Sequence, residues 1–268
     1  FVKKSTHIVC DNGYYMFSDN VCGVVMRQNR VWWVKQKIAI AKKGVKVLRT
    51  IPFVRAVFLC NILEKTADKE SDIDVCIVAK KNRIWIVRFW AMVLLHICRL
   101  RAHGKYTKDR VCLSFYCTED AFDFSTMRNC APDIYLAYWV RTLVPLYDPD
   151  DCYKKIQDSN TWIAPFIEVG QIKVSNPATV CILGRAGSLF HKFFLCAWAG
   201  HYGDIIDGWA KNIQKNRIKK IFSQPEEGAC RDVRISDSLL KLHHNDRRAL
   251  FQRKWAMRCK NLWREAGV

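Results

Sequence analysis

The sequence contains no apolar run long enough to cross a bilayer. Its longest such run, residues 89–98, is about half the ~20 residues that a transmembrane helix needs, and it suits a buried helix better. No signal peptide is visible either. The chain begins at Phe1 and not at Met, as it would after removal of an organelle-targeting segment. These features predict an intracellular protein.

Closely paired cysteines are also missing. The chain has 13 cysteines, an odd number, with no C-x-x-C motif, and the nearest pair is Cys112 and Cys117. Several lie in apolar runs, where a free cysteine behaves as a small buried hydrophobe. This usage predicts a reducing compartment, the mitochondrial matrix being one candidate, and predicts neither a disulfide framework nor a zinc site.

Acidic residues are few. The 44 lysines and arginines outnumber the 25 aspartates and glutamates, which gives a formal charge of +19. Such an excess predicts attraction to polyanions, and RNA is the expected partner, with an anionic membrane surface second. Half of the residues are hydrophobic and 10 are tryptophan, so the chain is globular. At 268 residues it can bury the core of one large or two small domains.

One short acidic motif stands out against this basic background. Ser71-Asp72-Ile73-Asp74 runs directly into the apolar residues 75–79, which predict a buried strand. Side chains alternate along a strand, so Asp72 and Asp74 point to the same face. Two such carboxylates can hold a hard cation, and Mg²⁺ is usually held by one or two carboxylates plus substrate phosphates. The alternative interpretation is an acidic turn that caps the strand.

The segments before this motif give it a context. Residues 52–59 predict a strand, residues 60–66 a short turn and helix, and the S-D-I-D motif opens a second strand. This arrangement resembles the catalytic hairpin of the polymerase-β-type nucleotidyltransferase superfamily. More narrowly, the chain resembles a group of uncharacterised bacterial nucleotidyltransferase-domain proteins. The motifs that carry this resemblance lie at residues 13–15, 51–54, 67–74, 81–85, 112–115, 133–139, 144–148, 160–163 and 239–248.

The resemblance implies an α+β fold, with a nucleotidyltransferase-like mixed sheet and packed helices, followed by a mainly helical C-terminal region. It also implies that Asp72 and Asp74 are catalytic and bind Mg²⁺. Asn61, Ser71 and Lys65 are then expected to contact the nucleotide.

Two features depart from the superfamily pattern. The Gly-Ser turn, where backbone N–H groups approach the triphosphate, is replaced by Cys60-Asn61. The third acidic residue normally lies on a later strand, but the candidate strand at residues 110–117 contains no carboxylate. Glu119 and Asp120 follow beyond its expected end. The sequence therefore predicts weakened or lost catalysis on an intact fold.

Three regions follow one another along the chain. Residues 1–50 predict a small strand-and-helix unit, residues 51–151 the nucleotidyltransferase-like domain, and residues 152–268 a mainly helical basic region. Within the second region, helices are expected at residues 83–101 and 133–144, the latter ended by a turn at residues 146–151.

Positive charge concentrates in two late segments. Arginines beside aromatics suit phosphate contacts combined with stacking on exposed bases. The alternative is an amphipathic helix whose aromatics face the core. The expected RNA-binding residues are Lys211, Lys215, Arg217, Lys219 and Lys220 in the first segment and Arg247, Arg248, Arg253 and Arg258 in the second, where Phe251, Trp255 and Trp263 are interleaved.

These observations favour two functions. The first is an RNA-binding subunit of a ribonucleoprotein, such as an organellar ribosome, that keeps a weakened catalytic motif and needs no cofactor. The alternative is an active transferase that moves a nucleoside monophosphate from an NTP and requires Mg²⁺. A membrane-surface protein that uses the basic helices is a third and weaker hypothesis.

Overall fold

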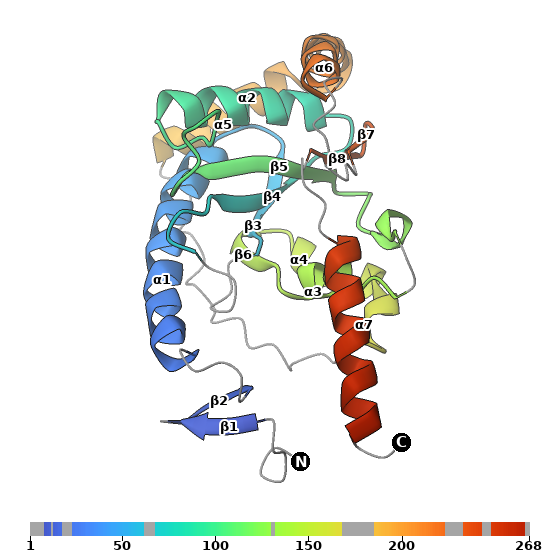
Figure 1. Cartoon of the computed structure of the whole chain (residues 1–268). Coiled ribbons are helices and arrows are strands. Elements are labelled where there is room, and N and C mark those ends of the chain that lie inside the picture. Colours follow the sequence, from blue (N-terminus) through green and yellow to red (C-terminus); the bar gives the residue numbers. More distant parts are fainter. Residues whose placement is uncertain are drawn as a thin grey trace.

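The computed structural model describes residues 8–11, 13–17, 23–61, 68–129, 132–167, 185–222, 233–242 and 248–265. Its centre is a six-stranded mixed sheet with the strand order β6-β3-β4-β5-β8-β7 (Figure 1). The pair β4–β5 is parallel and the other neighbours are antiparallel. The expected α+β class with a mixed sheet is therefore confirmed. The strands are β3 (Val54–Leu59), β4 (Ile73–Ala79), β5 (Val111–Thr118), β6 (Val144–Tyr147), β7 (Arg234–Ile235) and β8 (Leu239–Lys241).

Both faces of the central strands are covered. Val57 on β3 and Ile77 on β4 pack on one side of the sheet, whereas Phe58 and Cys76 pack on the other. A strand buried on both faces is apolar at consecutive positions and does not alternate between apolar and polar residues. This is why β3 and β4 were visible in the sequence as mainly apolar runs, interrupted only by Arg55 in β3 and Asp74 in β4.

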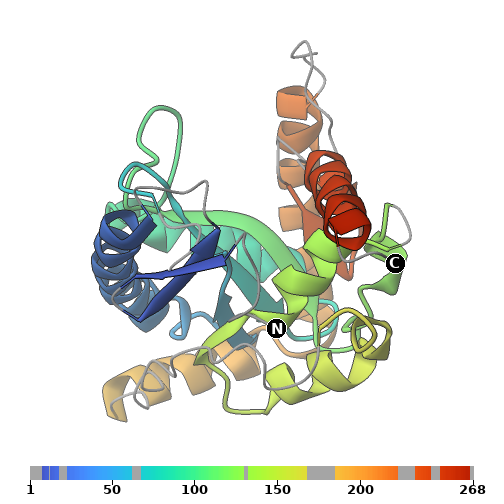
Figure 2. The same cartoon turned by 60° about the horizontal axis from the view of Figure 1, so that its bottom comes forward.

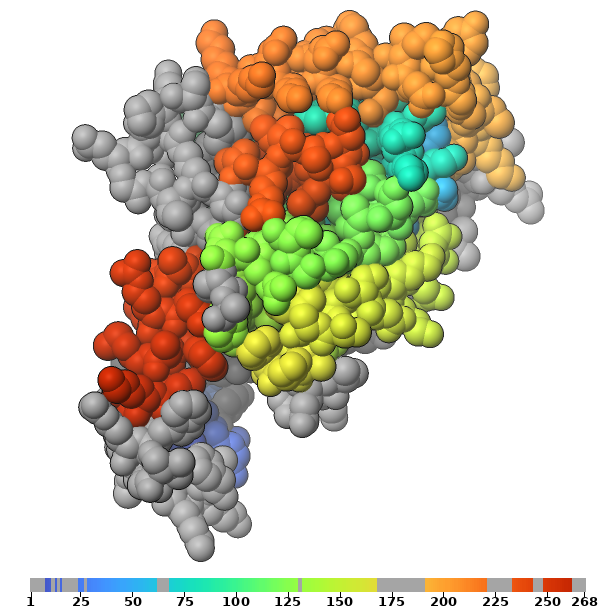
Figure 3. All heavy atoms as spheres, turned by 90° about the vertical axis from the view of Figure 1, so that its right-hand side faces the viewer, coloured from blue at the N-terminus to red at the C-terminus, as the bar shows by residue number. Residues whose placement is uncertain are grey.

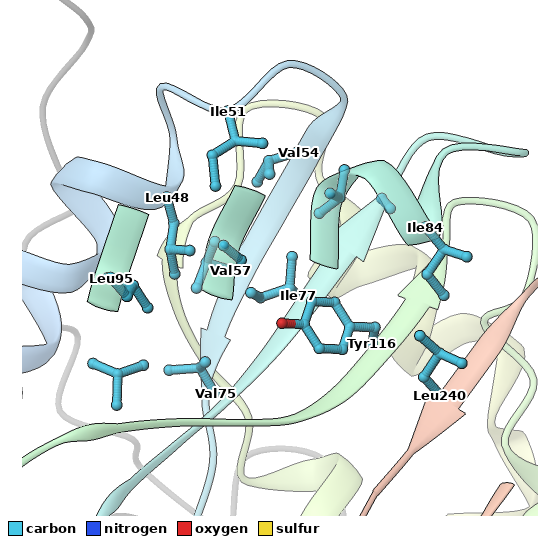
Figure 4. Close-up of a cluster of buried hydrophobic side chains, with 14 of the residues drawn as sticks. Leu48, Ile51, Val54, Val57, Val75, Ile77, Ile84, Leu95, Tyr116 and Leu240 are labelled. Atoms are coloured by element: carbon cyan, nitrogen blue, oxygen red, sulfur yellow. The ribbon is translucent and has the colours of Figure 1, made fainter. Parts of the chain in front are cut away.

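The first face is covered by α1 (Gly23–Leu48) and α2 (Ile84–Ile97). Leu48 of α1, Leu95 of α2 and Tyr116 of β5 meet in this core (Figure 4). Two further helices follow later in the chain, α5 (Arg185–Ala197) and α6 (Gly200–Phe222), and α6 packs on α2. The helix expected at residues 83–101 forms as α2 but ends at Ile97, and residues 98–101 turn back toward β5.

The second face is covered by α3 (Ile134–Arg141) and α4 (Cys152–Ser159). Trp139 of α3 packs against Phe115 of β5 with ring centroids 4.7 Å apart. Two short 3-10 helices, Ser125–Met127 and Thr161–Ile163, flank these helices.

The region after α3 corrects one expectation. The helix predicted for residues 133–144 ends at Arg141, and Val144–Tyr147 forms strand β6 where the end of the helix and a turn were expected. Val144 pairs with Leu59 of β3, so tertiary pairing decides the conformation of this short segment. Pro145 has no N–H to donate, which suits the edge position of β6.

The three predicted regions share a core. Val45 of α1, Ile77 of β4, Ile218 of α6 and Leu240 of β8 belong to the same buried cluster. The boundaries expected at residues 50 and 152 therefore do not separate independent cores. The described part of the last region is mainly helical, as expected, and it also supplies β7 and β8 to the sheet. A separate two-stranded sheet of β1 (Ile8–Asp11) and β2 (Tyr14–Phe17) precedes α1.

The last helix, α7 (Arg248–Glu265), extends away from the sheet and touches the body through α3 (Figure 1). Helix α7 contacts α3 on the second face of the sheet, whereas α6 packs on α2 on the first face (Figures 1 and 2). Across the described residues, no helix combines the length and the apolar character needed to span a membrane.

Candidate functional site

The two strands of the acidic hairpin form as the sequence predicts, whereas residues 62–66 of the expected turn and helix lie outside the described residues. Strand β3 ends at Leu59, and the N–H of Cys60 donates to the carbonyl of Asp74 at 2.9 Å, which closes the hairpin beside the start of β4. Candidate ligand atoms of Asp72 and Asp74 lie within 4.8 Å of each other. The two carboxylates therefore converge, as their spacing on an extended segment requires.

A cysteine completes this group. Cys112 on β5 lies opposite Asp74 in the parallel β4–β5 pair, and its Sγ lies within 4.8 Å of ligand atoms of both aspartates. The register of the pair shifts between Asp74 and Cys76, which introduces an irregularity in β5 just after Cys112. We refer to Asp72, Asp74 and Cys112 as the Asp–Asp–Cys cluster. All three residues are half-buried.

The candidates for a third carboxylate lie elsewhere. Glu119 and Asp120 follow the far end of β5, roughly 20 Å from Cys112 at about 3.3 Å per residue. Glu119 pairs with Arg55 at 2.8 Å and Asp120 pairs with Lys81 at 2.9 Å. Neither carboxylate can reach the cluster, so on the strand where a third acid was expected the residue beside the two aspartates is the thiol of Cys112.

Asp74 has one engaged and one unengaged carboxylate oxygen. Its Oδ2 accepts a hydrogen bond from Nδ2 of Asn61 at 3.2 Å. Its Oδ1 is buried and has no hydrogen-bond partner. A buried carboxylate oxygen without a donor is costly, and a bound cation is one way to remove that cost.

Cys112 on β5 and Cys60 at the end of β3 are both free thiols. Burial raises the pKa of the Cys112 thiol well above its usual range, and the negative charges of Asp74 and Asp72 raise it further. Burial likewise raises the pKa of Cys60, whose side chain packs in the core on the α3–α4 side. The Cys60 side chain is thus enclosed and does not project from the turn.

Two of the three expected nucleotide-binding residues, Asn61 and Ser71, lie in the described part of the hairpin. Asn61 holds a left-handed backbone conformation, with φ of 56°, and gives its side-chain amide to Asp74. Ser71 donates its hydroxyl to the carbonyl of Asp68 at 3.1 Å, two positions before the β4 strand begins. Lys65 lies outside the described residues.

The expected RNA-binding residues of the first basic segment all lie on α6. Arg217, Lys219 and Lys220 are exposed, and Lys215 is half-buried. Lys211 instead pairs with Asp237 at 2.7 Å. Figure 3 shows α6 across the top of one face of the molecule, with α7 on the same face below it.

The second basic segment divides into one buried and several exposed positions. Arg253 and Arg258 are exposed along α7, whereas Arg247 lies outside the described residues. Arg248 corrects the expectation. Its side chain is only 4% exposed, and its Nη1 donates to the carbonyl of Met127 at 2.7 Å and to Oδ2 of Asp133 at 3.1 Å. Arg248 therefore anchors α7 to the body and is enclosed away from the surface that a phosphate reaches.

Comparison with protein-family models, with curated proteins and with solved structures finds no match to this chain. What the site can do is therefore argued from its own residues.

Proposed function

We propose that this chain is an RNA-binding protein of a ribonucleoprotein, built on a nucleotidyltransferase-like α+β fold with a weakened catalytic site. The exposure of α7 carries the proposal. Between Ala249 and Asn261, every side chain is exposed except those of Gln252 and Cys259, which are half-buried. A helix that is exposed to solvent on most sides is stable only if its surface is strongly polar or if it binds a partner.

The chemistry of α7 suits a nucleic acid. In the part of the chain that the structure describes, no carboxylate lies within ion-pair distance of Arg253, Lys254 or Lys260. Phe251 stacks on Tyr135 of α3 with ring centroids 5.3 Å apart and is still 47% exposed. Trp255 is 41% exposed, so neither ring is enclosed in a core. Exposed rings beside unpaired cations provide both stacking and phosphate contact.

A second basic helix extends this surface. Arg217 and Lys219 of α6 are exposed. Helices α6 and α7 are both visible on the face of the molecule that Figure 3 shows. Two basic helices concentrate the positive field of a chain with a net charge of +19, which favours an extended polyanion over a small anion.

The weakened catalytic site is supported by the Asp–Asp–Cys cluster. A thiol takes the place of the third carboxylate, and the amide of Asn61 is already engaged with Asp74. Both changes remove groups that would otherwise stabilise a metal-bound triphosphate.

RNA binding is tested by fluorescence anisotropy of a structured RNA with the full chain over a series of salt concentrations. Changing Arg253, Lys254 and Lys260 to Gln removes three exposed charges from α7. The matched control changes Lys35, Lys43 and Lys46 of α1, which are also exposed, to Gln. Both variants have the same net charge, so only the location of the lost charges differs.

We expect the α7 variant to lose affinity and to reduce the slope of log K against log salt by about 2 to 3, since each phosphate contact contributes about 0.7 to 0.9. The α1 variant should bind nearly as the parent does. Equal losses in both variants would mean that only the overall field of the protein attracts RNA. No binding at low salt would overturn the proposal, because phosphate-driven association is strongest there.

A second function is favoured by the partnerless Oδ1 of Asp74. Convergent carboxylates with an unengaged, buried oxygen fit a divalent cation, so an active nucleotidyltransferase is the second candidate. Asp72 and Asp74 would hold the ion, which when bound would neutralise and orient the phosphates of an NTP. The test is an assay of nucleotide transfer to RNA with the parent protein and with the Asp72→Asn and Asp74→Asn variants. Transfer by the parent that is lost in both variants would establish an active enzyme in place of a weakened site.

A further inference from the structure

The donor set of the Asp–Asp–Cys cluster does not suit the ion that the superfamily resemblance implies. Mg²⁺ takes oxygen ligands in near-ideal octahedral geometry and has little affinity for sulfur. The cluster offers two carboxylates and one thiol from Cys112. A single carboxylate pair can hold Mg²⁺ only with help from water and substrate, whereas the thiol adds nothing to such a site.

The same donor set suits a softer ion. Zn²⁺ binds cysteine sulfur and carboxylate oxygen, and sites with three protein ligands leave a fourth position open. Two ligand atoms on one tetrahedral Zn²⁺ lie roughly 3.5 Å apart, from Zn–O near 2.1 Å and Zn–S near 2.3 Å. The three atoms of the cluster already lie within 4.8 Å of one another, so movements of about an ångström suffice.

One observation beyond this clustering points to a cation. Oδ1 of Asp74 is buried without a hydrogen-bond partner, while Oδ2 is held by Asn61 at 3.2 Å. Asn61 thus orients the carboxylate so that the unengaged oxygen is the one left for a ligand, which is the role of supporting groups around metal sites. Within the cluster, two negative charges lie side by side in a half-buried place, and an ion would compensate both.

We propose that Asp72, Asp74 and Cys112 bind a thiophilic divalent cation of the Zn²⁺ type in preference to Mg²⁺. The three ligands come from β4, the loop before it and the neighbouring strand β5, so the β4–β5 register creates the site. On binding, the S–H bond of Cys112 breaks, its proton passes to solvent, and the thiolate forms the bond to the metal. The sequence pointed away from zinc because it contains no paired cysteines; here a single thiol is sufficient because carboxylates supply the other ligands.

This proposal is independent of RNA binding, since α7 and the cluster lie in different parts of the fold. It is tested with the full chain by calorimetric titration of Zn²⁺ and, separately, of Mg²⁺. Titration with Co²⁺ adds an absorbance readout, because a cobalt–thiolate bond gives a charge-transfer band that oxygen ligands alone do not give.

Four variants locate the site. Cys112→Ser and Asp74→Asn each remove one ligand with little change in size, and both should weaken Zn²⁺ binding by more than the about 10- to 100-fold that loss of a supporting partner costs. Cys112→Ser should also abolish the charge-transfer band. Cys112→Asp restores a third carboxylate and should shift preference toward Mg²⁺. Cys98→Ser, at an exposed cysteine, is the control for adventitious thiol binding and should change nothing.

Circular dichroism of each variant separates loss of metal binding from loss of fold. Parent protein that binds Mg²⁺ as tightly as Zn²⁺ would overturn the proposal. The proposal would also be overturned if the folded Cys112→Ser and Asp74→Asn variants kept their Zn²⁺ affinity and the cobalt–thiolate band. The metal would then be bound by other cysteines.

Discussion

Nζ of Lys37 in α1 donates to the backbone carbonyl of Ser71 at 2.6 Å and to Oδ1 of Asp109 at 3.0 Å. The Lys37 side chain is only 2% exposed. Ser71 directly precedes Asp72, and Asp109 precedes the strand that carries Cys112. One buried ammonium therefore ties together the two segments that bring the Asp–Asp–Cys cluster into position.

Lys37→Met should lower the free energy of unfolding by roughly 1–3 kcal/mol, because Asp109 loses its ion-pair partner and the Ser71 carbonyl keeps only the longer hydrogen bond from the Asp109 N–H, at 3.3 Å. Urea denaturation measures this change. Lys43→Met, at an exposed position of the same helix, should stay within about 0.5 kcal/mol of the parent. If both variants unfold at the same urea concentration, Lys37 does not fasten these segments.

The pair Arg248–Asp133 fastens α7 in a comparable way. Both side chains are almost fully enclosed, at 4% and 2% exposure, and Oδ1 of Asp133 also accepts from the N–H of Leu136 at the start of α3. Arg248→Met should cost about 3–5 kcal/mol, because it leaves a buried carboxylate without its cation. This loss is measured by thermal unfolding, with one signal that reports on α7 and another that reports on the whole protein.

A double-mutant cycle makes that prediction specific. In an Asp133→Asn background the carboxylate charge is gone, so Arg248→Met should cost clearly less than in the parent. Arg253→Met, at an exposed arginine one turn later, should be nearly neutral. Equal costs of Arg248→Met in both backgrounds would show that packing, and not the ion pair, holds α7.

The sequence was informative where local pattern decides structure. The strands β3, β4 and β5 are long apolar runs, and the spacing of Asp72 and Asp74 on an extended segment was sufficient to predict that their carboxylates converge. Strand β6 was missed, because four residues that include Pro145 form a strand only through pairing with β3.

The role of individual side chains was less predictable, because it depends on contacts between distant segments. Cys112 joins the cluster through the register of two parallel strands, and no sequence signal distinguishes it from the other cysteines in apolar runs. Arg248 looks like its basic neighbours in the sequence, yet Asp133 makes it a buried structural residue.

A pH dependence is expected at the junction of α2 and α6. Oδ1 of Asp207 on α6 accepts from the N–H groups of Trp85 at 3.1 Å and Ile86 at 2.8 Å, so it caps a helix whose own first residues provide no side-chain cap. Burial raises the pKa of Asp207 to about 6, against the influence of Arg83, while Asp237 adds to the rise.

Because the folded-state pKa exceeds the unfolded value near 3.9, folded Asp207 binds a proton between about pH 4 and pH 6 that the unfolded chain does not. Its contribution to stability is therefore present below pH 4 and is lost as pH rises through 6. Asp207→Asn keeps the acceptor oxygen without the charge, so its stability relative to the parent should improve across this window. Urea midpoints at pH 4.5 and pH 7 measure the difference, and an unchanged difference at the two values would contradict the assignment.

The two glycines Gly203 and Gly208 in α6 provide a matched test of how this helix meets α2. A Cβ at Gly203 would lie 1.9 Å from the carbonyl oxygen of Trp198 and 2.6 Å from Nη2 of Arg83, whereas a Cβ at Gly208 would meet nothing within 4 Å. Both Gly→Ala changes gain about 0.8–1 kcal/mol of helix propensity. Only Gly203→Ala must also displace backbone and the Arg83 guanidinium, which donates to the carbonyl of Gly200 at 2.9 Å, at a cost of about 1–3 kcal/mol.

Calorimetric melting should therefore place Gly208→Ala above the parent and Gly203→Ala below Gly208→Ala. Equal melting temperatures for the two variants would mean that α6 does not approach α2 this closely in solution.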